Sequence, residues 1–212
     1  MGPEPKRRVR IERLTLGPYA TNAYMVICPE TGDSALVDAP AESSAIMRAA
    51  EESNPRYILI THSHMDHIGA LPDLKSKLKV PVAIHRLDMK ELPVRPDMLL
   101  EDGQEVSFGS VRLKVLHTPG HTPGSLSFLI GKQLLSGDTL FPHGPGRTGS
   151  PADLKRIIGS ITDKLFVLPD DTEVYPGHGD PTILAREKKE FAVFSARSHD
   201  PGLAGDVLWL SS

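Results

Sequence analysis

A strand-forming run of this chain ends in a dense cluster of histidine and aspartate. The run RYILI, residues 56–60, is rich in apolar and β-branched residues and leads directly into THSHMDH, residues 61–67. The cluster contains His62, His64, Asp66 and His67. With nine histidines in 212 residues, chance would produce the spacing H-x-H-x-D-H in about one of a thousand such chains. We therefore interpret the cluster as metal ligands rather than as a polar loop.

Three further candidate ligands each follow another predicted strand. His121 comes after VRLKVLHTPG, Asp138 after KQLLSG, and His178 after EVYPG. Loops at strand ends are places where a rigid scaffold brings together side chains from distant parts of a chain. We therefore expect these three residues to lie beside the first cluster.

The chemistry of the set indicates divalent metal ions. Imidazole nitrogen and carboxylate oxygen suit Zn²⁺, Fe²⁺ or Mn²⁺, whereas a thiolate-type structural zinc site needs cysteines. The chain has one cysteine, Cys28, which lies in an apolar strand-like run and is expected to be buried. Five histidines and two aspartates exceed the four ligands of one tetrahedral site. They suit two ions, the arrangement that many hydrolases use.

The hydrophobic pattern predicts strands that alternate with helices. Apolar alternation predicts strands at residues 10–17, 22–28, 34–40, 56–61, 80–85, 104–109, 111–118, 124–131, 132–138 and 171–176. Helical spacing and capping residues predict helices at 41–53, 68–78, 86–92, 150–169 and 181–197. Length and composition are those of one globular domain, residues 1–212, on which the helix and tail 181–212 pack.

The motifs in their order resemble those of the metallo-β-lactamase superfamily. The matching stretches are THSHMDH at 61–67, HTPGHTPGS at 117–125, SGDTLF at 136–141 and YPGHGDPT at 175–182. The resemblance implies an α/β fold, a four-layer αβ/βα sandwich of two mixed β-sheets flanked by helices. It also implies the ligand sets: His62, His64 and His121 for one metal, Asp66, His67 and His178 for the second, and Asp138 between them.

Within that superfamily the chain most resembles the short members of the glyoxalase II, or hydroxyacylglutathione hydrolase, group. The motifs are GDTLF, GRTGSPADL and LPDDTEVYPGHGDPT. The resemblance implies a hydrolase in which two metal ions, zinc or else iron or manganese, activate hydroxide against a thioester or ester. Asp66 and Asp138 are the expected catalytic carboxylates. The expected partner is a small molecule such as a glutathione-type thioester.

Two residues near Asp138 are candidate substrate contacts. Arg147 lies in GPGRTG, residues 144–149, where a guanidinium can grip a substrate carboxylate through two hydrogen bonds. The alternative is an arginine on a mobile surface loop. His143 lies in the same loop and is the second candidate.

Other functions remain open at this point. The GRT motif also resembles the persulfide dioxygenases, which would hold one iron by His62, His121 and Asp138, the two-histidine, one-carboxylate triad. A lactonase or esterase of the same fold is a further alternative. A metal-binding protein without catalysis would show a closed site.

Composition excludes several classes of partner. A net charge of −3 and the lack of a basic stripe disfavour nucleic acid as the partner. No apolar stretch approaches the roughly 18 residues needed to span a bilayer. The first residues contain no apolar leader, so we expect a cytoplasmic protein. Leu208, Trp209 and Leu210 either pack back on the domain or meet a second copy in a homo-oligomer.

The remaining histidines are not predicted to be ligands. His117 and His85 end strands near the predicted metal edge, where each either supports the ligands by hydrogen bonding or belongs to the core. His199, near the C-terminus, is expected to be structural.

Overall fold

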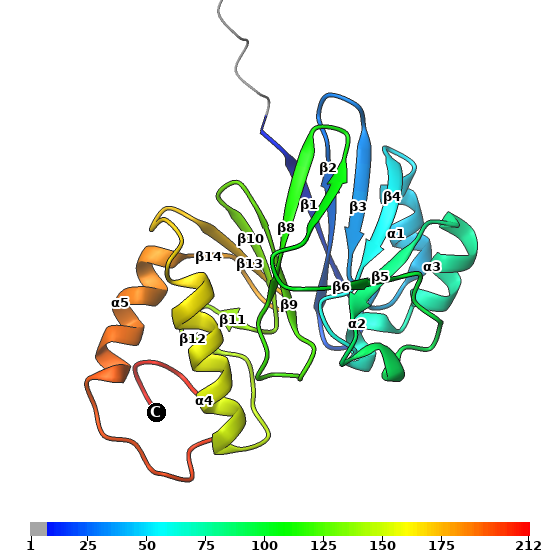
Figure 1. Ribbon diagram of the computed structural model, residues 1–212. Helices are drawn as coiled ribbons and strands as arrows, with labels where there is room; N and C mark the ends of the chain where they lie inside the picture. Colours follow the sequence, from blue (N-terminus) through cyan, green and yellow to red (C-terminus); the bar gives the residue numbers. More distant parts are fainter. Residues whose placement is uncertain (1–7) are drawn as a thin grey trace, which may run out of the picture.

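Two β-sheets face each other, and helices cover their two outer faces (Figure 1). The computed structural model describes residues 8–212. The expectation that the first residues contain no apolar leader falls partly on residues 1–7, which lie outside the described residues. Both large sheets have six strands in this part of the chain. The order helix, sheet, sheet, helix confirms the predicted αβ/βα sandwich.

The first sheet has the strand order β1-β2-β3-β4-β5-β6. Its strands are β1 (Arg10–Leu16), β2 (Thr21–Ile27), β3 (Asp33–Val37), β4 (Asn54–Leu59), β5 (Val82–His85) and β6 (Met98–Leu100). Strands β1 to β3 pair antiparallel, and β3 to β6 pair parallel. Parallel neighbours need crossover connections. These contain α1 (Ser43–Ala50), α2 (Met65–Ile68), α3 (Leu71–Leu78) and the 3₁₀-helix η1 (Met89–Glu91).

The second sheet has the order β14-β13-β10-β9-β8-β7. Its strands are β7 (Glu105–Phe108), β8 (Val111–His117), β9 (Leu126–Ile130), β10 (Gln133–Gly137), β13 (Glu173–Pro176) and β14 (Thr182–Ile183). Only the pair β10 and β13 is parallel among these neighbours. Helix α4 (Pro151–Ser160), continued by the π-helix η2 (Ile161–Leu165), makes that crossover, and α5 (Leu184–Ser195) follows β14. A small separate sheet pairs β11 (Leu140–Phe141) with β12 (Gly144–Pro145).

Alternation along the strands separates the core into layers. In β2, Val26 belongs to the cluster between the two sheets, together with Phe128 of β9. Its neighbour Met25 points the other way and belongs to the cluster beneath α1 and α3, together with Ile46. Successive side chains of a strand face opposite sides of a sheet, so both faces of β2 are buried. A third cluster lies between the second sheet and α4, α5 and the C-terminal segment.

The boundaries of two predicted helices differ from those in the structure. The helix expected over 150–169 changes to a π-helix at Ile161 and ends at Leu165. The helix expected over 181–197 starts only at Leu184, because Thr182 and Ile183 pair with β13. Strands β6, β11, β12 and β14 were not predicted. Each has only two or three residues, too few to show an alternating pattern.

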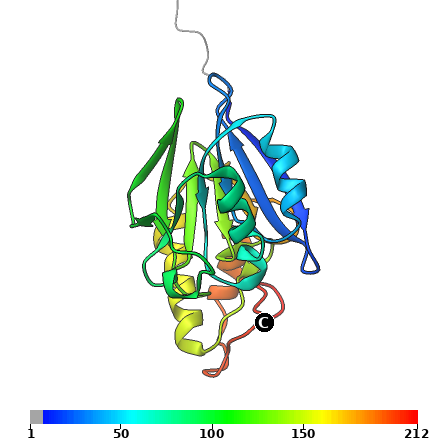
Figure 2. The same cartoon turned by 90° about the vertical axis from the view of Figure 1, so that its right-hand side faces the viewer.

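The C-terminal segment, residues 196–212, returns to the second sheet. It passes beside α4 and α5 at the end of the molecule where α2 also lies (Figures 1 and 2). The indole of Trp209 is fully buried in the third core cluster, whereas Leu208 and Leu210 remain about half exposed. Trp209 thus packs against the second sheet and its helices.

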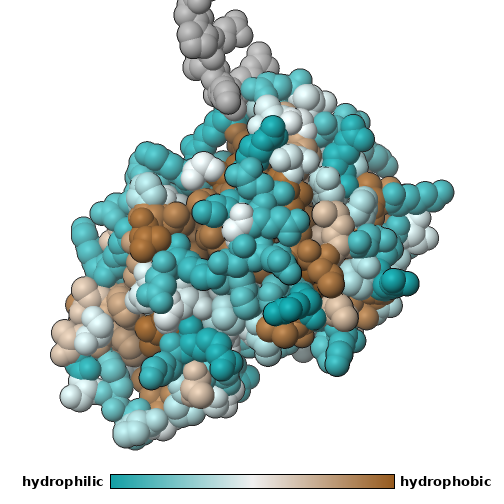
Figure 3. All heavy atoms as spheres, viewed as in Figure 1, coloured by the Kyte–Doolittle hydropathy of each residue, from teal (hydrophilic) through white to brown (hydrophobic). Residues whose placement is uncertain are grey.

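The surface mixes polar and apolar side chains. On the face drawn in Figure 3, apolar residues form small patches between hydrophilic ones. Within residues 8–212, no helix is both long and apolar enough to cross a bilayer.

Candidate metal centre

All seven predicted ligands lie at strand ends that meet at one edge of the sandwich. The ligands in residues 62–67 follow β4 of the first sheet, and the other three follow β8, β10 and β13 of the second sheet. Strands β10 and β13 are parallel, so their carboxyl ends meet at the same edge. A Cβ atom at Gly177 would lie 2.1 Å from Asp138 Oδ1. A glycine is therefore required where the loop after β13 passes Asp138.

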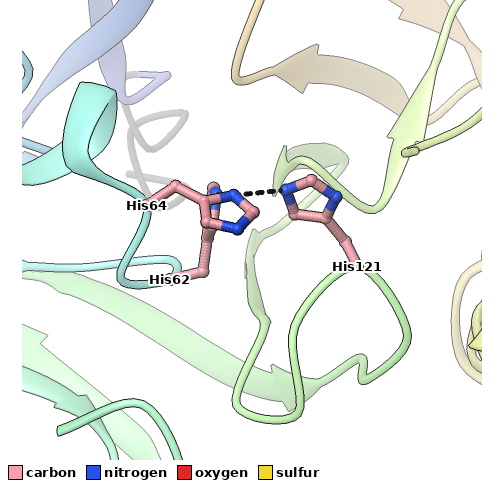
Figure 4. Close-up of side chains that lie close together, drawn as sticks. All are labelled: His62, His64 and His121. Carbon is pink, nitrogen blue, oxygen red and sulfur yellow. Dashed lines mark hydrogen bonds between the residues drawn. The ribbon is translucent and has the colours of Figure 1, made fainter. Parts of the chain in front are cut away.

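The first group consists of three imidazoles whose nitrogens converge. His64 Nδ1 lies 3.1 Å from His62 Nε2 and 2.9 Å from His121 Nε2. His62 and His64 come from the loop after β4, and His121 reaches them from the loop after β8 (Figure 4). Adjacent rings meet nearly edge-on, at 84° and 88°. Three nitrogens therefore face one point, as ligands of a single ion do.

The second group combines two imidazoles with a carboxylate. His67 Nε2 and His178 Nε2 are 3.3 Å apart. Asp66 Oδ2 lies 3.2 Å from the nitrogen of His178 and 3.7 Å from that of His67. The donor atoms of all three residues lie within 4.8 Å of one another.

Asp138 lies between the two groups. Its Oδ1 is 3.4 Å from His67 Nε2, and its Oδ2 is 3.5 Å from the Nε2 atoms of both His121 and His178. One carboxylate thus faces ligands of both sets. This is the geometry that a bridging ligand requires.

The donor set fits divalent metal ions. Asp138 Oδ1 is buried and has no hydrogen-bond partner among residues 8–212. Buried polar atoms in proteins are normally paired, so an unpaired carboxylate oxygen aimed at imidazole nitrogens indicates a missing cation. All donor atoms are nitrogen or oxygen, as Zn²⁺, Fe²⁺ and Mn²⁺ prefer.

The outer ring nitrogens of four ligands are also engaged. His62 Nδ1 lies 3.0 Å from Thr61 Oγ1. His121 Nδ1 lies 2.8 Å from the carbonyl oxygen of Arg147, and His178 Nδ1 lies 3.0 Å from that of Tyr19. A hydrogen bond at the outer nitrogen holds the ring orientation and leaves the inner nitrogen free to bind a metal.

The fourth of these outer partners is Asp38, which sequence analysis missed. Its Oδ2 lies 2.8 Å from His67 Nδ1, and its carboxylate accepts hydrogen bonds of 2.8 Å from Thr61 N and Thr61 Oγ1. Asp38 directly follows β3 and has a φ of 62°. Asp38 follows a predicted strand, as the candidate ligands do, and this position could have drawn attention to it. Nothing in the sequence placed it beside His67.

Burial and neighbouring charges shift the pKa values of these groups. Complete burial, with His67 and other imidazoles nearby, holds the pKa of His62 well below its ordinary value. Burial also lowers the pKa of His67, but the carboxylates of Asp38 and Asp138 outweigh it and raise that pKa to about 10. Burial raises the pKa of Asp138, yet the neighbouring imidazoles of His178 and His67 bring it well below the ordinary range. Asp138 is therefore a charged carboxylate among imidazoles.

Comparison with known proteins agrees with this geometry. A model of the metallo-β-lactamase superfamily matches residues 16–178, which include all seven predicted ligands. The chain belongs to the metallo-β-lactamase superfamily. The probable metallo-hydrolase YqgX of Bacillus subtilis (strain 168) is 34% identical over 201 residues, covering 84% of this chain and 94% of the relative. Hydroxyacylglutathione hydrolase GloC of Haemophilus influenzae is 29% identical over 213 residues, covering 90% of this chain and 100% of the relative.

Solved structures of the superfamily share the fold. The B3 metallo-β-lactamase BLEG-1 superposes with a TM-score of 0.77 at 30% identity, over 85% of this chain and 97% of that one. TTHA1623, solved in a di-iron-bound form, superposes with a TM-score of 0.73 at 37% identity, over 84% and 97%. The superfamily assignment confirms the resemblance seen in the motifs.

A cavity of about 300 Å³ opens beside the metal centre of this superfamily member. Its lining combines three predicted ligands with the loop after β10 and the C-terminal segment. These residues are His121, Asp138, Phe141, Pro142, Gly144, Pro145, Arg147, His178, Asp206, Val207 and Leu208. Arg147 therefore reaches the cavity, and its guanidinium Nε lies 3.8 Å from Asp206 Oδ2. Residues 206–208 of the C-terminal segment form part of the cavity wall. The sequence did not predict that they belong to the site.

His143 lies near the cavity, but its ring turns to α5. Its Nδ1 is 2.8 Å from Glu190 Oε2, and Arg186 lies 3.0 Å from its Nε2. These contacts occupy both ring nitrogens. The structure thus brings Arg147, but not the imidazole of His143, to the cavity.

The other histidines support the fold around the centre. His85 and His117 stack on each other with ring centroids 4.0 Å apart and join β5 to β8 across the two sheets. His199 stacks on Phe194 at 3.9 Å. Cys28 is buried, as expected.

Proposed function

We propose that this protein is a metal-dependent hydrolase that cleaves a thioester or ester of a small, carboxylate-bearing molecule. The observation that carries the proposal is the position of Asp138. Its carboxylate faces both groups of ligands and also lines an open cavity. Catalytic metal sites keep a position open to substrate, whereas structural sites are closed by protein ligands. The cavity therefore favours catalysis over metal storage.

In the proposed site the ligands divide into two sets. His62, His64 and His121 would hold one ion, Asp66, His67 and His178 would hold the other, and Asp138 would be shared between them. The convergence of the donor atoms supports this division, as does the di-iron form of TTHA1623. We propose zinc, with iron or manganese as alternatives that suit the same donors. When bound, such ions supply a hydroxide nucleophile at neutral pH and stabilise negative charge on a substrate oxygen.

Asp66 is the proposed general base. Thr21 donates a hydrogen bond of 3.0 Å to Asp66 Oδ2, which fixes the carboxylate at the mouth of the centre. We propose that this carboxylate orients the attacking water and accepts its proton while the new C–O bond forms. The proton then passes to the leaving sulfur or oxygen as the C–S or C–O bond breaks. Water and thioester thus give an acid and a thiol.

Arg147 is the proposed substrate-binding residue. A guanidinium at the cavity wall matches a carboxylate in geometry and charge. The carboxylate of Asp206 lies near it, so the cavity offers one cation and one anion to a substrate. A glutathione-type thioester carries both charges and fits this pair.

Three further properties belong to the proposal. Residues 1–212 form one domain, which the burial of Trp209 against the second sheet supports. The enzyme works in the cytoplasm on a small molecule, not on nucleic acid. The half-exposed Leu208 and Leu210 are available for contact with a second copy of the chain.

Metal analysis followed by two parallel assays tests the function. The purified protein is assayed for hydrolysis of S-D-lactoylglutathione and for oxygen uptake with glutathione persulfide. Two ions per chain with thioester cleavage are the expected result. A single iron with oxygen uptake would identify the persulfide dioxygenase alternative. Cleavage of lactones or simple esters without cleavage of thioesters would identify the lactonase or esterase alternative.

A further inference from the structure

Asp88 is a buried carboxylate outside the predicted ligand set. It follows β5 at the start of η1, and only 2% of its surface is exposed. Its backbone amide donates a hydrogen bond of 3.1 Å to the carbonyl oxygen of His85, which anchors the residue to the first sheet. A buried carboxylate is costly unless it is well paired, so its partners indicate its role.

The partners of Asp88 lie in two different ligand loops. Its Oδ2 accepts hydrogen bonds from Ser63 N at 3.2 Å and from Thr122 Oγ1 at 2.7 Å. Its Oδ1 accepts one from Gly124 N at 2.7 Å. A Cβ atom at Gly124 would lie 2.4 Å from Asp88 Oδ1, so glycine is required for this close approach.

These two loops supply the three-histidine group. Ser63 stands between His62 and His64 in the loop after β4, and Thr122 follows His121 in the loop after β8. The loops belong to opposite sheets of the sandwich. One carboxylate thus ties together the two segments whose separation sets the distance between His64 and His121.

The second group of ligands has other supports. His67 is held by Asp38, and His178 by the carbonyl oxygen of Tyr19. Asp88 makes no hydrogen bond to Asp66, His67 or His178 among the contacts of the described residues. A change at Asp88 therefore acts on one half of the centre.

We propose that Asp88 is a positioning residue that sets the metal affinity of the His62, His64 and His121 group and leaves the second group unaffected. This inference rests on the proposed two-metal function. Outer partners of metal ligands typically change affinity by about 10- to 100-fold. Loss of the Asp88 carboxylate frees the two loops to separate, and the three imidazoles then no longer converge.

Metal titration of Asp88→Asn tests the inference. The asparagine keeps the size of the side chain but puts an NH₂ group among the donors of Ser63, Thr122 and Gly124. Apoprotein is titrated with Zn²⁺ against a competing chelator, and ¹¹³Cd NMR reports the two sites separately, since they differ in nitrogen and oxygen ligands. We expect the affinity of the site held by His62, His64 and His121 to fall by about tenfold or more. The mixed site should keep its affinity within about twofold.

Two further variants separate positioning from general damage. Asp97→Asn is the matched control, because Asp97 also follows β5 and accepts a hydrogen bond from a backbone amide, that of Val82, but touches neither ligand loop. It should leave both ions unchanged. Thr122→Val removes the hydroxyl that donates to Asp88 and also contacts Ser125 Oγ. It should weaken the same three-histidine site if Asp88→Asn does not fold. Thermal unfolding of each apoprotein reports whether the fold is intact.

Each outcome bears on one proposal or the other. Equal loss of both ions, or unchanged affinity at both, in the folded variants would overturn the role of Asp88. If the wild type binds a single ion, the two-metal function fails. The role of Asp88 is then decided by whether Asp88→Asn weakens that ion relative to Asp97→Asn. A wild type that binds no ion overturns both proposals.

Discussion

Asp38 and His67 are joined by a 2.8 Å contact between Oδ2 and Nδ1, and both side chains are sealed from solvent. Asp38 leaves β3, whereas His67 belongs to α2, so the contact links two segments that are far apart in sequence. The same carboxylate accepts two hydrogen bonds from Thr61. Through Asp38, the first sheet thus orients a ligand of the second group.

Asp38→Asn should weaken metal binding at the second group. The amide replaces an acceptor oxygen by a donor, so either His67 or Thr61 loses its partner. We expect a fall of about 10- to 100-fold in affinity for one ion, measured by Zn²⁺ titration of the apoprotein. Asp33→Asn, at the other end of the same strand, is the control and should bind like the wild type. An unchanged affinity in Asp38→Asn would show that His67 is oriented by other contacts.

Asp138→Asn should reduce metal content and turnover together. An amide lacks the charge and the second anionic oxygen that face both groups. We expect kcat to fall by about 100-fold or more, since each loss of about 1.4 kcal/mol of transition-state stabilisation is a factor of ten. Metal content is measured by elemental analysis alongside thioester hydrolysis. Normal activity in Asp138→Asn would rule out the two-metal assignment.

Arg147→Met should impair only substrates that carry a carboxylate. A charge-assisted hydrogen bond contributes about 1.5–3 kcal/mol, so KM for such a thioester should rise by about tenfold or more. An uncharged thioester should react with nearly unchanged KM. Steady-state kinetics with the two substrates makes the comparison. Equal effects on both substrates would assign Arg147 to loop structure instead.

Trp209→Ala should destabilise the fold and loosen the cavity wall. The indole is fully buried and packs edge-on against Phe191 and Phe194 at 5.2 Å, while its backbone amide donates to the His143 carbonyl oxygen. Truncation of such a residue costs about 3–5 kcal/mol. Urea unfolding gives the free energy. Leu210→Ala, which changes a half-exposed residue, should cost less than about 0.5 kcal/mol.

Asp97→Asn should lower stability at neutral pH but not in acid. The Val82 amide and the Lys75 ammonium hold the pKa of Asp97 below its ordinary value. A carboxyl group with a lowered pKa stabilises the fold above its unfolded pKa of about 3.9, and that stabilisation is lost as pH falls through the folded pKa. Because Asp97 is half exposed, we expect a loss of about 0.5 kcal/mol at pH 7. Unfolding at pH 7 and at pH 2 checks it, and an equal loss at both would contradict this account.

The candidate ligands of the metal centre could be proposed from sequence because they lie in loops that follow predicted strands. His62, Asp138 and His178 come one to three residues after buried runs, and the fold brings such strand ends to one edge. The four candidate ligands within residues 62–67 are close together in sequence, so their proximity could be predicted without knowledge of the fold. The hydrophobic pattern likewise made the long strands and helices predictable, whereas the two-sheet sandwich was implied by the resemblance of the motifs to the metallo-β-lactamase superfamily.

Contacts between distant segments were decided by the tertiary structure. Asp38 and Asp88 read as ordinary strand-end aspartates, and only packing of the two sheets places them on ligand loops. The cavity wall at residues 206–208 exists because Trp209 is buried beside α5. His143 sits in the predicted loop, yet Glu190 draws its ring away from the cavity. The local sequence pattern thus determined which residues are candidate ligands. The hydrogen bonds that hold those residues in place, and the wall of the cavity, depend on packing between segments that are distant in sequence.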